Sequence, residues 1–293
     1  MPPAMPADPS AQPQELHCYR HNDRVAGVRC QRCERPICPS CMRQASVGFH
    51  CPDCAGAHTT KVISGPAAFG RASDPIVTKV LIGINAAVWL LMTVTGGSAN
   101  SPAGPVFEQG ATWGPRVAEG EWYRLVSGAF LHGSFLHLAM NMFLLWLLGR
   151  SLEPVVGRMQ FLGLYAVSLL GGSLGVMMID PTAATVGASG AVFGLMGAMV
   201  VLQLRAGQSP WQSGIGTLVA LNLVITFAVP GISIGGHLGG LVAGSLGALV
   251  LAGGHEKGGA PMLARAGLLA AFAVTLAAAS VVVIQQEFPQ LAG

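Results

Sequence analysis

The chain has 293 residues, of which 52% are hydrophobic and 10% charged, with a formal net charge of +3. Soluble domains carry about 25% Asp, Glu, Lys and Arg, so this composition excludes a large soluble globule and favours a protein covered mostly by lipid. The 40 glycines agree, because helices in membranes pack closely through small residues. The near-neutral charge gives no reason to expect nucleic acid as a partner.

The N-terminal part of the chain forms a separate module. Residues 1–15 are rich in Pro and Ala and lack the basic start and apolar stretch of a signal peptide, so we expect a disordered tail. The clustered cysteines place a small domain at residues 16–56, followed by a linker at 57–74. All seven cysteines lie in this domain: Cys18, Cys30, Cys33, Cys38, Cys41, Cys51 and Cys54.

The spacing of cysteine and histidine in this module indicates metal binding. Four ligand pairs are each separated by two residues: Cys18 and His21, Cys30 and Cys33, Cys38 and Cys41, and Cys51 and Cys54. Eight nitrogen and sulfur ligands suit two tetrahedral structural Zn²⁺ ions. A disulfide framework is the alternative, but it would leave one cysteine unpaired and would not explain the spacing. His17 and His50 lack this spacing, and we do not expect them to be ligands.

Residues 16–56 resemble a B-box-type zinc finger. The resemblance implies that Cys18, His21, Cys38 and Cys41 bind one zinc, and that Cys30, Cys33, Cys51 and Cys54 bind the other. So small a fold should form only with its metal, and zinc thiolates imply a reducing compartment, the cytoplasm. Closed four-ligand sites leave no position for a substrate, so we expect the module to stabilise the protein or bind a protein partner.

Seven apolar segments follow, most of them near the length that a bilayer requires. We expect an all-α polytopic membrane protein with helices at 76–95, 131–149, 160–179, 188–204, 214–229, 234–252 and 262–284. The fourth helix is short and begins just after Gly187, so its start should lie below the membrane surface, where such starts line a cavity.

The distribution of Lys and Arg predicts the orientation. Outside the zinc module, eight cations fall on one side of the predicted membrane: Lys61, Arg71, Lys79, Arg150, Arg158, Arg205, Lys257 and Arg265. Only Arg116 and Arg124 fall on the other side. The positive-inside rule therefore places the N-terminus in the cytoplasm and the C-terminus outside, in a multi-pass protein of the cell membrane. The loop at 96–130 then faces outward, with Trp113, Trp122 and Tyr123 as interfacial anchors.

Four polar residues in the apolar segments are functional candidates, because polar groups at membrane depth are costly. His137 and Asn141 are four residues apart and share one helix face. Ser189 starts a helix between Gly187 and Gly190, where a tight turn is accessible and unpaired backbone N–H groups suit a developing oxyanion. His237 is the fourth candidate.

These residues supply the parts of a serine nucleophile site. Ser189 is the expected nucleophile and His237 the general base, with His137, Asn141 and the Ser189 N–H as oxyanion donors. The nearest acidic residues, Glu153 and Asp180, fall at helix ends, so we expect a Ser–His dyad. Each residue alone has a packing explanation: serine among glycines, a histidine bonded to a helix carbonyl, an asparagine joining two helices. Their occurrence together favours catalysis.

The arrangement resembles the rhomboid family of intramembrane serine proteases from the first predicted helix to the sixth. The motifs are His132-x4-His137-x3-Asn141, Gly187-x-Ser189-Gly190 and Gly236-His237-x2-Gly240-x3-Gly244. The resemblance implies a six-helix catalytic core at residues 75–255, which needs no cofactor for catalysis. Residues 256–293 are expected to form a loop, the seventh transmembrane helix and a C-terminal tail, and a seventh helix after the six-helix core resembles the 6+1 subclass of the family.

The same resemblance assigns supporting roles. Tyr123-Arg124 matches a Trp-Arg element of the outer loop that lies in the interface, and Glu153 matches an acidic position that braces neighbouring loops. Phe193 stands where the family often has a tyrosine that stacks on the catalytic histidine. His132 is expected to be structural, near the mouth of a water cavity. Gly240 and Gly244 are among the small residues expected to let the sixth helix pack against the fourth.

The expected function is that of an intramembrane serine endopeptidase that cleaves transmembrane segments of other membrane proteins. The resemblance implies substrates with small or helix-breaking residues near the scissile bond, which is consistent with an intact helix hiding its carbonyls. One alternative is a catalytically silent relative that binds transmembrane helices as a chaperone or escort. Another is a transporter or channel that uses the same polar residues as a pathway.

Overall fold

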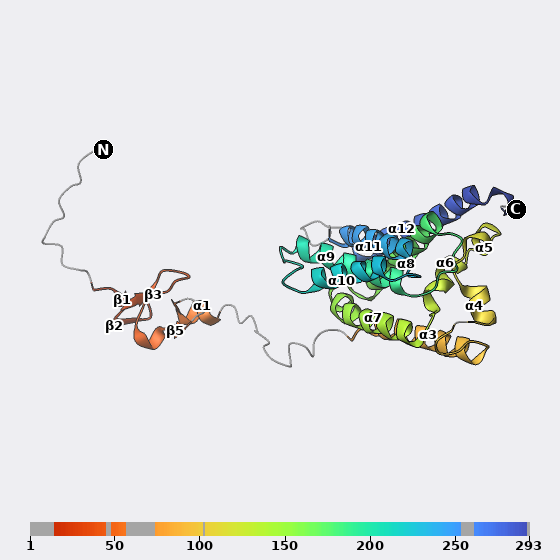
Figure 1. Cartoon of the computed structure of the whole chain (residues 1–293). Helices are drawn as coiled ribbons and strands as arrows, with labels where there is room; N and C mark the ends of the chain where they lie inside the picture. The colour runs from red at the N-terminus through yellow and green to blue at the C-terminus, as the bar shows by residue number, and fades with distance from the viewer. Residues whose placement is uncertain (1–14, 45–47, 57–73, 102, 253–260, 292–293) are drawn as a thin grey trace. The chain divides into compact units, whose positions relative to one another are not determined.

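The computed structural model describes residues 15–44, 48–56, 74–101, 103–252 and 261–291. The chain divides into two compact units, residues 1–72 and 73–293 (Figure 1). Nearly all of the predicted tail, most of the predicted linker and most of the predicted loop before the last helix fall on residues 1–14, 57–73 and 253–260, which lie outside the described residues.

The first unit is built from short antiparallel strand pairs. The pairs are β1 (His17–Cys18) with β2 (His21–Val25), β3 (Val28–Arg29) with β4 (Pro36–Ile37), and β5 (Arg43–Gln44) with β6 (Phe49–His50). A 3₁₀ turn, η1 (Pro39–Cys41), and a short helix, α1 (Pro52–Gly56), complete it.

The core of this unit consists almost entirely of cysteine. Its buried apolar residues, within the described part, are Cys18, Cys30, Ile37, Cys38, Cys41 and Cys51. One isoleucine cannot stabilise a domain of this size by hydrophobic burial, since domains so small usually need disulfides, metals or association. The interactions that join the cysteine side chains must therefore provide most of the stability of this unit.

The second unit contains seven long apolar helices among the described residues. They are α3 (Ile76–Val94), α7 (Phe135–Val156), α8 (Arg158–Ile179), α9 (Ser189–Arg205), α10 (Ile215–Ala228), α11 (Ile234–Ala252) and α12 (Met262–Glu287). Five of them, α3, α7, α8, α11 and α12, are long and apolar enough to cross a membrane, while α9 and α10 are shorter. Large apolar side chains such as Val94 and Val274 are about 70% exposed, as suits contact with lipid. The prediction of a helical membrane protein is confirmed.

The second predicted helix differs most from the observed one. It begins at Phe135 rather than 131, because the Ser134 hydroxyl accepts the His137 N–H at 3.1 Å and caps the helix there. It also continues beyond 149 to Val156 and ends at Gly157, whose φ of 88° is left-handed. The charged residues near its end had indicated a loop, whereas they lie in the last turns of α7.

The predicted loop at 96–130 contains structure that the sequence pattern did not indicate. Within its described residues it forms α4 (Pro105–Gly110), α5 (Gly114–Ala118), α6 (Arg124–Ser127) and a 3₁₀ turn, η2 (Gly128–Phe130). Helices of four to six residues are too short to show an apolar period.

Helix α11 packs backbone to backbone against two neighbours. It contacts α8 and α9, α8 also contacts α12, and α3 contacts α7. Figure 1 shows α3 and α7 along one side of the unit and α12 along the opposite side. A Cβ added at Gly240 would overlap the Gly190 carbonyl, and one at Gly244 would overlap the backbone of Gly194. Glycine therefore permits the approach of α11 to α9. The contacts with α8 are of the same kind, between Gly235 and Gly175 and between Gly239 and Gly171.

Candidate active site and metal sites

The structure brings the eight predicted metal ligands together in two groups. One contains Cys18, His21, Cys38 and Cys41, and the other Cys30, Cys33, Cys51 and Cys54. Within each group the ligand atoms all lie within 4.8 Å of one another. This grouping is the one that the zinc-finger resemblance implies.

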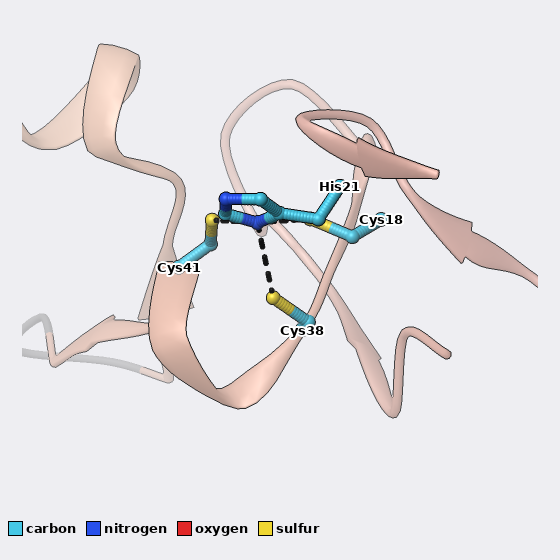
Figure 2. Close-up of side chains that lie close together, drawn as sticks. All are labelled: Cys18, His21, Cys38 and Cys41. Carbon is cyan, nitrogen blue, oxygen red and sulfur yellow. Dashed lines mark hydrogen bonds between the residues drawn. The ribbon is translucent and has the colours of Figure 1, made fainter. Parts of the chain in front are cut away.

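The separations between ligand atoms fit a tetrahedral zinc site. Nδ1 of His21 lies 3.8 Å from the sulfur of Cys18, 3.5 Å from that of Cys38 and 3.3 Å from that of Cys41 (Figure 2). A tetrahedron with Zn–S of about 2.3 Å and Zn–N of about 2.05 Å separates sulfur from nitrogen by about 3.6 Å and sulfur from sulfur by about 3.8 Å. In the other group, the sulfurs of Cys33 and Cys51 are 3.7 Å apart.

The cysteines are free thiols, and hydrogen bonds lower the pKa of four of them, Cys18, Cys30, Cys38 and Cys51. A disulfide would bring two sulfurs to about 2.05 Å, whereas all seven cysteines are unbonded, so the disulfide alternative finds no support. The Ser40 hydroxyl lies 3.1 Å from the Cys38 sulfur and, despite burial, lowers the pKa of this thiol to about 6. A thiolate at neutral pH is the form that binds metal.

In the helical unit, Ser189 is the first residue of α9. Its backbone N–H therefore precedes the hydrogen-bonded ladder of the helix. The preceding Gly187 has a φ of 126°, and its N–H donates to the Gly128 carbonyl at 2.9 Å. A Cβ at Gly187 would lie 2.6 Å from the His137 ring. Both the left-handed backbone and the close approach require glycine here.

His237 lies in the first turn of α11, where the Ser233 hydroxyl accepts the Gly236 N–H at 3.1 Å. The ring of His237 is buried and stacks on Phe193 of α9, with ring centroids 4.0 Å apart and planes inclined by 17°. Its Nδ1 lies 2.7 Å from Oγ1 of Thr226 on α10. Two contacts from two other helices thus hold this imidazole.

His137 and Asn141 share one face of α7. The Gly133 N–H donates to Nδ1 of His137 at 3.4 Å, so Nε2 carries the proton of the neutral ring. Nδ2 of Asn141 donates to the His137 carbonyl at 2.9 Å, which uses one of the two amide hydrogens.

A cavity of about 760 Å³ brings the four predicted residues together. His137, Asn141, Ser189 and His237 all line it, from α7, α9 and α11. No hydrogen bond joins Ser189 to His237 among the described residues. His132 is not a lining residue. It is 1% exposed and its ring lies edge-on to His137 at 5.1 Å, with no hydrogen-bond partner for either nitrogen in the described part of the chain.

Arg124 is buried within the loop at 96–130 and forms hydrogen bonds to several of the loop's residues. It is 3% exposed, whereas Tyr123 is 55% exposed, so of the two residues matched to an interfacial element only the tyrosine lies at the surface. Nη1 of Arg124 donates to the carbonyls of Glu108 and Ala111 at 2.9 and 3.0 Å. Its Nε donates to the Glu121 carboxylate, and this bond lowers the pKa of Glu121.

Glu153 contacts a helix start. Its carboxylate accepts the N–H groups of Val77 and Thr78, each at 2.9 Å, and the Thr78 hydroxyl at 2.7 Å. The resemblance implied that this position braces loops, but the partner in this structure is the first turn of α3. A carboxylate is favourable there because it satisfies unpaired N–H groups at the positive end of the helix dipole.

Thr226 is the residue that the sequence reasoning missed. It is 1% exposed and touches the candidate base, yet a threonine in an apolar helix has no distinctive spacing. Its relation to His237 depends on how two helices pack, and no motif carries that information.

Comparisons with known proteins agree on one family. A model of the rhomboid domain matches residues 119–254. Rhomboid protease GluP of Bacillus subtilis (strain 168) is 35% identical over 214 residues, which cover 71% of this chain and 41% of that protein. RHOMBOID-like protein 5 of Arabidopsis thaliana is 40% identical over 135 residues, covering 44% of this chain and 43% of that protein. The chain thus spans less than half the length of these two relatives.

A shorter relative is matched over most of its length. The putative rhomboid protease YdcA of Bacillus subtilis (strain 168) is 34% identical over 176 residues, which cover 59% of this chain and 86% of that protein. The apolar helices and these relatives identify a multi-pass membrane protein. The chain belongs to the rhomboid family.

Proposed function

We propose that this protein is an intramembrane serine endopeptidase with Ser189 as nucleophile and His237 as general base. The observation that carries the proposal is the single cavity that both residues line together with His137 and Asn141. A serine at a helix start, a neutral imidazole and two further polar side chains are the parts that acyl transfer needs.

The chemistry proceeds in two halves. Nε2 of His237 takes the proton of Ser189 as Oγ bonds to the scissile carbonyl carbon, and the carbonyl oxygen becomes an oxyanion. The C–N bond then breaks, and His237 gives its proton to the leaving amine. In the second half, a water loses a proton to His237 and its oxygen bonds to the acyl carbon. The bond between this carbon and Oγ then breaks and His237 returns the proton to Oγ, which releases the new carboxyl end and restores Ser189.

The oxyanion is stabilised by hydrogen-bond donors that are not used within the protein. They are the Nε2–H of His137, the second amide hydrogen of Asn141 and the backbone N–H of Ser189. The hydrogen bond between Ser189 and His237 forms only when substrate occupies the cavity, since catalytic hydrogen bonds are often loose in free enzymes.

The substrates are transmembrane segments of other membrane proteins, and the preferred ones have small or helix-breaking residues near the scissile bond. Unwinding exposes the carbonyl that an intact helix hides. The protein lies in the cell membrane with its N-terminus in the cytoplasm and its C-terminus outside, as the distribution of Lys and Arg favours.

The zinc module holds two structural Zn²⁺ ions and takes no part in the chemistry. Cys18, His21, Cys38 and Cys41 would hold one ion, and Cys30, Cys33, Cys51 and Cys54 the other. The metals supply folding free energy, because they replace a hydrophobic core. The folded module, of B-box type, stabilises the protein or binds a protein partner.

The deciding experiment compares wild-type protein with Ser189→Ala and a matched control, Ser151→Ala. Ser151 is exposed on α7, and its hydroxyl donates to the Leu147 carbonyl of its own helix. Membrane proteomes of cells expressing each variant are compared for cleavage fragments. We expect fragments with wild type and Ser151→Ala and none with Ser189→Ala.

Active-site labelling separates the alternatives. A fluorophosphonate should label Ser189 in the wild-type protein but not in His237→Ala. Wild-type fragment levels with Ser189→Ala would overturn the protease assignment. Absence of both labelling and fragments in folded wild-type protein would overturn the protease assignment in favour of a silent relative that binds transmembrane helices or of a transporter or channel.

A further inference from the structure

Helix α10 packs on the core through Ile215 and the half-buried Leu218, Val219 and Leu223, and it has one buried polar side chain, Thr226. Of its residues only Ile215 and Thr226 are buried, whereas Leu221, Val224 and Phe227 are 55–63% exposed. Burying a threonine hydroxyl is costly unless the hydroxyl makes a hydrogen bond. The buried contact that α10 makes next to the cavity is therefore polar, and it is made to His237.

The hydroxyl of Thr226 has two partners and one proton. Oγ1 lies 2.7 Å from the Asn222 carbonyl and 2.7 Å from Nδ1 of His237. A carbonyl can only accept, so the hydroxyl donates to Asn222. The second contact is then a hydrogen bond from Nδ1–H of His237 to the lone pair of Oγ1.

This assignment fixes the tautomer of the imidazole. With the proton on Nδ1, the neutral ring keeps its lone pair on Nε2. Nε2 has no hydrogen-bond partner among the described residues, and His237 lines the cavity that contains Ser189. Phe193 restrains the plane of the ring through the stack, but it has no polar group that could select a tautomer.

We propose that Thr226 is a positioning residue, which holds His237 in the Nδ1–H tautomer with Nε2 free to accept the proton of Ser189. The inference rests on the proposed protease function. In a catalytic triad a carboxylate accepts the Nδ1–H of the histidine and sets its tautomer. Here the neutral hydroxyl oxygen of Thr226 is the acceptor. It acts from a different helix than the base, so the protonation pattern of the base depends on α10 being in place.

The test uses the full chain in detergent with three substitutions. Thr226→Val removes the hydroxyl but keeps the shape of the side chain, Thr226→Ser keeps the hydroxyl, and Thr217→Val makes the same change at an exposed position of α10. Turnover is measured with a transmembrane peptide substrate. Because general-base catalysis contributes about 10²–10⁴-fold, loss of the correct tautomer in Thr226→Val should lower kcat about tenfold or more with KM unchanged. Thr226→Ser should restore kcat to near the wild-type value, and Thr217→Val should match wild type.

A second measurement does not depend on activity. The ¹⁵N resonances of the His237 ring, assigned by their loss in His237→Gln, report which nitrogen is protonated. We expect protonated Nδ1 in wild type and Thr226→Ser, and a shift toward protonated Nε2 in Thr226→Val. Protonated Nε2 in the wild-type protein, or wild-type kcat in folded Thr226→Val, would overturn the proposal. Absence of Ser189-dependent cleavage would count against the protease function alone, and the NMR result would still decide the tautomer.

Discussion

Three polar side chains of the cavity, His137, Asn141 and His237, each use one group in a hydrogen bond to the surrounding protein and leave another group free. His137 accepts at Nδ1, Asn141 donates one amide hydrogen to its own helix, and His237 contacts Thr226 through Nδ1. The free groups are two donors and one lone pair. This division matches the requirements of an oxyanion site and of a base, so the same contacts that orient the side chains also set what they can do.

Substituting Asn141 tests the donor role directly. Asn141→Ala should lower kcat about 10²-fold with little change in KM, because an oxyanion donor acts in the transition state. Ser151→Ala, on the same helix and with a similar bond to its own backbone, is the matched control. Equal kcat in the two variants would remove Asn141 from the mechanism.

At the scale of helices, the apolar runs could be predicted from sequence because lipid imposes a minimum length on them. The predicted segment 234–252 coincides with α11, and 76–95 differs from α3 by one residue. The end of α7 could not be predicted in the same way. Charge normally marks a loop, but Glu153 is 1% exposed and its charge is satisfied by the start of another helix.

The candidate site, too, could be predicted only in part from the sequence. Ser189, His237, His137 and Asn141 stand out because they are polar residues within apolar segments. Thr226 does not, since threonine is common in such segments, and only the packing of α10 against α11 reveals its partner.

Replacing glycine by alanine should have opposite effects on stability at two sites, one in the contact between α11 and α9 and the other on an open face of α3. Gly244→Ala places a methyl group against the Gly194 backbone, so the helices must separate, at a cost of about 1–3 kcal/mol in the free energy of unfolding and with loss of proteolysis. Gly83→Ala in α3 meets nothing within 4 Å and should raise stability by up to about 1 kcal/mol. Thermal unfolding in detergent measures both, and a stable, active Gly244→Ala would contradict the packing described.

The anchoring of α3 by Glu153 has its own test. Glu153→Ala leaves buried N–H groups without an acceptor, and hydrogen bonds to a charged group contribute about 1.5–3 kcal/mol each, so the melting temperature should fall by several degrees. Glu287→Ala, at the exposed end of α12, is the control and should leave the melting temperature unchanged. An unchanged melting temperature in Glu153→Ala would show that α3 is held by its apolar contacts alone.

At the scale of the whole molecule, the two units differ in the interactions that stabilise them. The helical unit has a large buried apolar cluster, whereas the first unit has five cysteines and one isoleucine in its place. One unit should therefore respond to metal removal and the other should not.

Metal analysis tests the first unit. We expect about two Zn²⁺ per chain, with His21→Ala retaining one ion and His50→Ala both, since only His21 belongs to a ligand group. A strong chelator should make residues 16–56 sensitive to protease while the thermal transition of the helices persists. Two ions retained by His21→Ala would refute the proposed ligand set.

Removing the first unit tests its separation from the chemistry. A chain that begins at Asp74 should cleave a detergent-solubilised substrate at a rate within about twofold of the full chain, because every residue of the cavity lies after that point. Loss of activity in a folded truncated protein would show that the zinc module contributes to catalysis.

The glycine contacts of α11 also bear on inhibitor design. On that side of Ser189 the wall is main chain packed on main chain, from Gly236 to Gly190, and it cannot rearrange to admit a bulky group. Helix α10 lines another part of the cavity through Asn222 and Ile225, and only two of its side chains are buried. Ligands of the cavity should therefore be able to carry larger substituents toward α10 than toward α11.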